Sequence, residues 1–105
     1  MPTPTTLIVL FNLKPGVTTE RYEAWAKATD LPIVRDLKAV RSFDVYKAAG
    51  TLSGASSPYQ YVEIIHLAAD LATFRAEVAN ETMRRVAAEF RELADGPTFI
   101  VTQAL

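Results

Sequence analysis

The chain has 105 residues, a net charge of −1 and no cysteine, and half of its residues are hydrophobic. This length and composition predict one globular domain over residues 1–105 and exclude disulfides and thiolate metal sites. Acidic and basic residues are interspersed, which argues against a nucleic-acid or anionic-membrane surface, and no apolar run approaches the ~20 residues of a membrane span.

The first predicted element is a strand. A polar lead over residues 1–5 is followed by an apolar run at residues 6–13. Such a run, without regular alternation, is typical of a strand buried on both faces. Its one polar interruption, Asn12, falls on the same face as Ile8 and Leu10. A Lys-Pro-Gly sequence then predicts a turn.

A helix and a second strand follow the turn. Thr18 or Thr19 can cap the helix, which we expect to end near Asp30 because a proline lies two residues further on. We expect Asp30 itself to cap a second, short helix that runs to about Leu37. Alternating polarity over residues 39–48 then predicts a strand at the edge of a sheet.

The second half of the chain repeats the pattern of strand, helix and strand. A Gly/Ser-rich linker at residues 49–58 precedes an aromatic and β-branched run at residues 59–67, which predicts a central strand. Asp70 is expected to cap the next helix. The apolar phase of that helix slips near Asn80, which predicts two helices in series, and an Asp-Gly-Pro sequence is expected to end the second one. A last strand is expected at residues 98–103.

The predicted order is β-α-β-β-α-β, the ferredoxin-like plan of the α+β class. Right-handed crossovers place the helices on one face of a four-stranded antiparallel sheet whose first and third strands are central. The expected register turns these residues toward the helices: Val62, Ile64, His66, Phe43 and Val45. It turns these residues toward the open face: Tyr61, Glu63, Ile65, Tyr46, Ile8 and Leu10.

The open face of this sheet would be too apolar to meet water. An apolar patch of that size on a small domain usually marks an interface or a ligand cleft. Two copies packed sheet to sheet about a two-fold axis would cover it. We therefore predict a homodimer through the open sheet face.

Motifs of a known family run through most of the chain. They are Leu10–Val17, Tyr22–Trp25, Thr29–Pro32 with Val34 and Arg35, Ser42–Tyr46, Pro58–Glu63, Glu81–Met83 and Ala87–Phe90. On these residues the chain resembles the REDY-like HapK family, which is associated with pigment and secondary-metabolite gene clusters. The Lys-Pro-Gly turn and the aromatic-rich helix are also similar to EthD-type, quinol-monooxygenase and antibiotic-biosynthesis monooxygenase-like domains. Asp30 stands where the EthD-type branch often has a histidine.

The resemblance implies a dimeric α+β barrel, in which two sheets pack face to face and each subunit keeps a pocket. It implies a reaction only loosely, because this superfamily spans monooxygenases, isomerases, haem enzymes and binding proteins.

Glu63 is the first candidate for catalysis. Its carboxylate lies on an otherwise apolar strand face, where desolvation would raise its pKa and suit it to general acid–base work. The alternative is a structural ion pair with Arg35 or Arg41.

Asn12 is the second candidate for catalysis, and Tyr46 and Tyr61 are expected to line the same pocket. The amide and the two phenols could orient a ligand carbonyl or stabilise an oxyanion. Alternatively, these groups satisfy one another's hydrogen bonds at a dimer seam.

Four further residues are candidates for substrate binding. Tyr22 and Trp25 could form an aromatic wall for a flat ligand, although aromatics at helical spacing more often belong to the core. Asp30 and Arg35 are expected to form a helix cap and a structural ion pair, or to lie at the pocket mouth. His66 is expected to be structural.

The resemblance, together with these candidate residues, implies a small-molecule enzyme of secondary metabolism, a cofactor-independent monooxygenase or isomerase that acts on an aromatic, polyketide or pyrrole-like molecule. One alternative is a carrier protein for a hydrophobic metabolite. The other is a protein whose cleft is filled by its own side chains and whose dimer is the functional surface. With one histidine and no carboxylate cluster at ligand spacing, we expect no metal. The cysteine-free composition and the start without basic residues favour a cytoplasmic location.

Overall fold

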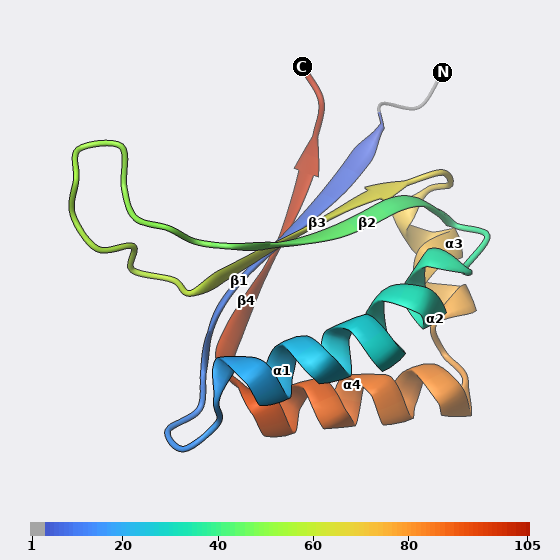
Figure 1. Ribbon diagram of the computed structural model, residues 1–105. Helices are drawn as coiled ribbons and strands as arrows, with labels where there is room; N and C mark the ends of the chain where they lie inside the picture. The colour runs from blue at the N-terminus through green and yellow to red at the C-terminus, as the bar shows by residue number, and fades with distance from the viewer. Residues whose placement is uncertain (1–3) are drawn as a thin grey trace.

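The computed structural model describes residues 4–105. Its elements are β1 (Thr5–Leu13), α1 (Thr19–Trp25), the π-helix η1 (Ala26–Asp30), α2 (Leu31–Arg35), β2 (Val40–Lys47), β3 (Tyr61–Leu67), α3 (Leu71–Glu77), α4 (Glu81–Leu93) and β4 (Ala94–Gln103). The strands form one antiparallel sheet in the order β2-β3-β1-β4, and the helices cover one of its faces (Figure 1). The predicted ferredoxin-like α+β fold is confirmed. No helix in residues 4–105 has the length and apolar character to cross a membrane.

The hydrophobic core lies between the sheet and the helices. Alternate residues of β1 are buried, as the helix-covered face of a strand requires. Phe11 is central: its ring centroid lies 5.4 Å from that of Tyr22, 5.5 Å from that of Tyr61 and 4.9 Å from that of Phe90. Aromatic pairs of this kind stabilise a fold by about 0.5–1.5 kcal/mol each beyond the burial of their area. They join β1 and β3 to α1 and α4.

Three side chains cap helices: Thr18 and Asp70, where the sequence predicts caps, and Asn80, where it predicts a helix break. Thr18, Asp70 and Asn80 each accept a hydrogen bond from the backbone N–H three residues further on, at 3.1, 2.8 and 2.8 Å respectively. These bonds satisfy backbone donors that a first helical turn leaves free. The Asn80 cap also confirms the predicted break between two helices in series.

The first helix does not stop at Asp30, and the prediction that this residue caps a second helix is wrong. Asp30 is itself helical (φ −66°, ψ −54°), and its side chain makes no capping hydrogen bond. In η1 the Leu31 N–H donates to the Ala26 carbonyl, five residues back, so this turn is wider than an α-helical turn. A wider turn relieves the clash between the ring of Pro32 and the carbonyl four residues before it, and the helix therefore continues to Arg35.

The predicted register of β3 is inverted. Glu63 pairs with Val9 and Val45, and the face that these residues share turns toward the helices. Three residues of β3 share this helix side: Tyr61, Glu63 and Ile65. Three others point to the open face: Val62, Ile64 and His66. Both faces of β3 are apolar, so alternation alone does not decide which one the helices cover.

The remaining register predictions agree with the structure. Phe43 and Val45 lie on the helix side, whereas Ile8, Leu10 and Tyr46 lie on the open face. In β1 the one polar interruption, Asn12, marks the open face, and in β2 the apolar residues Phe43 and Val45 share the face that the helices cover.

The last helix ends without the predicted glycine cap. It stops at Leu93, and Ala94 (φ −93°, ψ 139°) already begins β4, so helix and strand join directly. Gly96, at φ +54°, instead lies where the pairing of β1 with β4 shifts register between Leu10 and Asn12. A left-handed residue in a sheet irregularity is a position that favours glycine.

Candidate functional site

A cavity of about 440 Å³ lies between the sheet and the helices α3 and α4. Its walls are mainly apolar and include Phe43, Ile65, Phe74, Val86, Phe90 and Phe99. Two carboxyl groups, those of Asp30 and Glu63, also line it. This is the size and lining of a small-molecule site: apolar walls with a few converging polar groups.

Glu63 reaches the cavity from the middle of a central strand. The pairing of β3 with β1 and β2 turns its side chain inward, where it is only 4% exposed. Its Oε2 atom is buried without a hydrogen-bond partner among residues 4–105. The alternative reading of an ion pair with Arg35 or Arg41 is therefore wrong, since neither arginine pairs with Glu63.

Asp30 enters the cavity from the helical layer. It is the last residue of η1 and is 6% exposed. Its side chain makes no capping hydrogen bond to the helix, so its carboxyl group is available to interact with groups in the cavity. π-Helical turns recur at functional sites, where they redirect a side chain.

Burial raises the pKa of both carboxyl groups. The pKa of Glu63 rises to about 8, first through burial and then through the nearby negative charge of Asp30. The pKa of Asp30 rises to about 7, through burial. Two buried like charges cannot both ionise without cost, so the pair holds a proton near neutral pH. One member can then donate a proton while the other accepts one.

A phenol lies close to this pair. Tyr22 is fully buried, and its hydroxyl has no hydrogen-bond partner among residues 4–105. Burial raises the pKa of Tyr22 well above its ordinary value, and the charges of Glu63 and Asp30 raise it further. The phenol therefore stays protonated and offers a neutral hydrogen-bond donor beside the two carboxyl groups.

The structure does not bring together the four polar groups predicted for one pocket. Asn12 and Tyr46 lie on the open face, opposite Glu63. The Asn12 side chain donates to the Pro58 carbonyl at 3.1 Å and accepts from the Gln60 N–H at 3.0 Å, so it fastens the end of the β2–β3 loop.

Tyr61 shares the helix side with Glu63 but does not line the cavity. Its hydroxyl donates to Oε2 of Glu23 at 2.6 Å, and Lys47 lies 3.2 Å from the same oxygen. Asn12, Tyr46 and Tyr61 therefore neither line one pocket nor bond to one another, which were the two predicted alternatives. The reason is the inverted register of β3, which puts Tyr61 on the opposite face of the sheet from Asn12 and Tyr46.

Trp25 also has a structural position. Its Nε1 donates to Oε1 of Glu89 at 2.8 Å, and its ring stacks on Phe90 with centroids 6.3 Å apart. It ties α1 to α4 and is absent from the lining of the cavity. The aromatic walls come instead from Phe74, Phe90 and Phe99.

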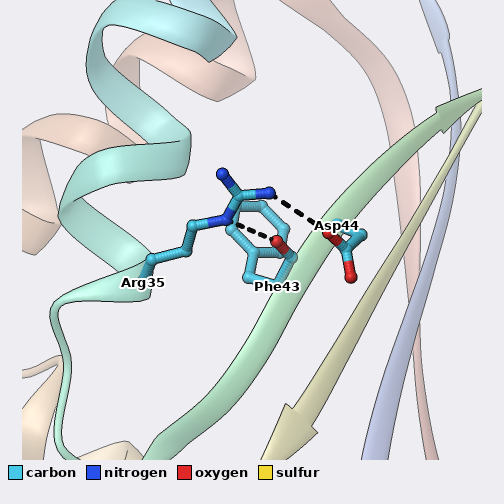
Figure 2. Close-up of polar contacts among 3 residues, drawn as sticks. All are labelled: Arg35, Phe43 and Asp44. Atoms are coloured by element: carbon cyan, nitrogen blue, oxygen red, sulfur yellow. Dashed lines mark hydrogen bonds and ion pairs between the residues drawn. The ribbon is translucent and has the colours of Figure 1, made fainter.

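Arg35 pairs with β2 rather than with Asp30 (Figure 2). Its Nε donates to the Phe43 carbonyl at 2.9 Å, and its Nη2 lies 3.1 Å from Oδ1 of Asp44. The predicted Asp30–Arg35 pair is therefore wrong. His66 is structural but lies on the exposed open face, where its Nδ1 is 2.9 Å from Oγ1 of Thr6.

Sequence reasoning missed two arginines that line the cavity, Arg84 and Arg91. A spacing of seven residues puts them on one side of α4, next to the apolar stripe that includes Val86 and Phe90. The seven-residue spacing is the feature of the sequence that could have identified these two arginines. Within residues 4–105, no three His, Asp or Glu side chains come together as a metal-binding group.

The fold and this site define a ferredoxin-like α+β protein with a carboxyl-lined pocket between sheet and helices. The chain belongs to the family of the REDY-like protein HapK, whose family model matches residues 5–105. HapK from Hahella chejuensis has a similar structure, with a TM-score of 0.78 and 28% identity over 96% of this chain and 92% of that one. No match to a curated protein sequence was found.

Two more distant structures share the fold. Hydroxynitrile lyase from Passiflora edulis superposes with a TM-score of 0.82 and 10% identity over 100% of this chain and 96% of that one. A dimeric ferredoxin-like protein of unknown function from Thermobifida fusca does so with a TM-score of 0.78 and 15% identity over 99% of this chain and 93% of that one. At these identities the likeness concerns the fold alone.

Proposed function

We propose that this protein is an enzyme of secondary metabolism that moves protons on an aromatic, polyketide or pyrrole-like molecule, without a cofactor. The observation that carries this proposal is the pair Asp30 and Glu63, two buried carboxyl groups in one apolar cavity with pKa values of about 7 and about 8. A general acid or base works best when its pKa lies near the operating pH. Neither carboxyl group forms an ion pair within residues 4–105, which favours a role in the site over a structural one.

The pair can isomerise a carbonyl-containing ligand. The ionised carboxylate accepts a proton from the carbon next to the carbonyl, which breaks a C–H bond and leaves the electron pair in the enolate. The protonated carboxyl group donates its proton to the oxygen, giving the enol, and the reverse transfers return a proton to a different carbon. Tyr22 does not line the cavity, but its buried hydroxyl can donate a hydrogen bond to the carboxyl group of Glu63 and so stabilise its ionised form. No oxidant or reductant is required.

Support for an enzyme also comes from the relatives. The fold is shared with a hydroxynitrile lyase, so this fold is compatible with catalysis. The family resemblance connects this chain with secondary metabolites, which are often aromatic or polyketide in character.

Replacing Glu63 with Gln distinguishes an enzyme from a carrier protein. In a host strain that lacks the gene, we expect wild-type protein to restore the product and E63Q to accumulate the substrate, which native mass spectrometry should find bound to purified E63Q. If E63Q restores the product as well as wild type does, the protein is a carrier and the proposed catalysis is wrong.

We also propose that the protein is a homodimer through its open sheet face. Apolar side chains gather there from three strands: Ile8, Leu10, Val62, Ile64 and Ile100. A dimer that buries this face is consistent with the dimeric relative of the same fold. Light scattering should give twice the chain mass, and Ile64→Lys should give a monomer. A wild-type monomer at micromolar concentration would contradict this proposal.

A further inference from the structure

The mouth of the carboxyl-lined cavity carries two positive charges. Arg84 and Arg91 both line the cavity, although both are exposed to solvent at its rim. They extend from α4, two helical turns apart, with Ala87 between them on the same side of the helix. The cavity therefore has acidic groups deep inside and basic groups at its entrance.

Neither arginine forms an ion pair with another side chain of residues 4–105. Within residues 4–105 the ion pairs are Arg35 with Asp44 and Lys47 with Glu23, and neither involves the arginines at the mouth. These arginines are also not among the groups that alter the pKa of Asp30 or of Glu63. They are not there to neutralise the buried carboxyl groups, so their charge is free for a ligand.

The neighbouring Arg85 provides a contrast. It lies on α4 between Glu81 and Glu89, each four residues away, which is the spacing of helical ion pairs. It does not line the cavity. Arg84 also has an acidic neighbour, Glu81, three residues before it, and none of the three arginines forms an ion pair within residues 4–105. What distinguishes Arg84 and Arg91 from Arg85 is that they line the cavity.

We infer that the ligand of this cavity is an amphipathic carboxylate, with an apolar ring system in the pocket and its negative charge at the mouth between Arg84 and Arg91. A guanidinium group binds a carboxylate through paired, charge-assisted hydrogen bonds. The opposite orientation would bring the ligand's negative charge against two carboxyl groups. The apolar end of the ligand therefore faces Asp30 and Glu63.

This inference rests on the proposed function, because it names the substrate class of the same site and orients the substrate in it. The group that reacts lies at the apolar end, several atoms away from the carboxylate. The carboxylate itself is a handle for binding and orientation.

The test compares two probes of one shape, 2-naphthoate and its neutral amide 2-naphthamide, by isothermal titration calorimetry on the full chain. We expect wild type to bind 2-naphthoate at least about tenfold more tightly, as a charge-assisted hydrogen bond provides. The double variant R84Q/R91Q should lose this preference and keep its affinity for 2-naphthamide. R84K/R91K should retain part of it, and the matched control R85Q should retain all of it.

Several outcomes would overturn the inference. Equal affinity of wild type for the two probes would contradict it. So would a preference for 2-naphthoate that survives in R84Q/R91Q or disappears in R85Q. These results would not affect the acid–base proposal. If neither probe binds, this inference fails together with the pocket as a site for aromatic ligands. E63Q should keep the preference for 2-naphthoate, because Glu63 takes part in the reaction and not in binding the carboxylate. The activity of E63Q is measured separately, by product formation in the host strain.

Discussion

Asp30 and Glu63 approach the same cavity from opposite layers of the fold, one from a π-helical turn and the other from a central strand. Burial raises the pKa of both, and the negative charge of Asp30 raises that of Glu63 further. A folded chain keeps such a destabilising arrangement when it serves a site.

The first prediction concerns stability and pH. The pKa of Glu63 is raised from 4.5 to about 8, so the folded protein binds more protons than the unfolded chain between these values. The free energy of unfolding must then fall as the pH rises through this window. Relative to that of wild type, the free energy of unfolding of E63Q in urea should rise by about 3 kcal/mol between pH 5 and pH 8.

The difference between wild type and E63Q removes the contributions of other titrating groups. Below about pH 4 it should be constant, since Glu63 is then protonated in both the folded and the unfolded state. A difference that does not change from pH 4 to pH 9 would mean that Glu63 has an ordinary pKa.

The second prediction concerns the coupling within the pair. Replacing Asp30 with Asn removes one cause of the raised pKa of Glu63 but leaves burial, which is the larger cause. The pKa of Glu63 should drop below that in wild type and remain above 4.5, as carbon-13 NMR of labelled glutamate can measure. D36N is a matched control, because Asp36 is exposed and does not line the cavity. An unchanged pKa in D30N would show that the two groups do not interact.

The third prediction concerns Tyr61. Its hydroxyl donates to Glu23, so Tyr61→Phe removes a hydrogen bond to a charged group and should lower the free energy of unfolding by about 1 kcal/mol. Y46F is the control, because Tyr46 is 53% exposed on the open face. Chemical denaturation of both variants measures the effect. Equal stability of Y61F and wild type would contradict the structural role assigned to Tyr61.

The fourth prediction concerns the start of α4, the helix that forms most of one cavity wall. Asn80 accepts from the Met83 N–H at 2.8 Å, and its Nδ2 donates to the Glu77 carbonyl at 2.7 Å. Asn80→Ala should cost about 1 kcal/mol of stability, whereas Asn80→Asp should keep most of the cap. Equal loss in the two variants, seen in thermal unfolding, would mean that the cap is not the cause.

Most of the fold could be predicted from the sequence because its signals are local. The cap at Asp70, the break between two helices near Asn80 and the order of elements follow from patterns of a few residues. The side of the sheet that β3 turns to the helices is set by its pairing with β1 and β2, which is a non-local property. Because the predicted register of β3 is inverted, it places Tyr61 and His66 on the wrong faces of the sheet.

The candidate site could be predicted only in part. A lone carboxylate on an apolar strand marks Glu63, and this signal does not depend on which face is covered. Asp30 was read as a helix cap, because sequence alone does not reveal a π-helical turn that lets a helix pass Pro32. Arg84 and Arg91 look like ordinary solvated residues until the cavity beside α4 is known.

The central claim is that Asp30 and Glu63 hold a proton at neutral pH. Its most direct test is carbon-13 NMR of the side-chain carboxyl groups in the wild-type protein, followed from pH 3 to pH 10. The account predicts two carboxyl resonances that titrate far above the others, near pH 7 to 8. The Asp30 resonance should be absent in D30N, where Glu63 titrates lower than in wild type but still above 4.5, and the Glu63 resonance should be absent in E63Q. If every carboxyl group instead titrates near pH 4, the pair is ionised at neutral pH and cannot be the acid–base centre described above.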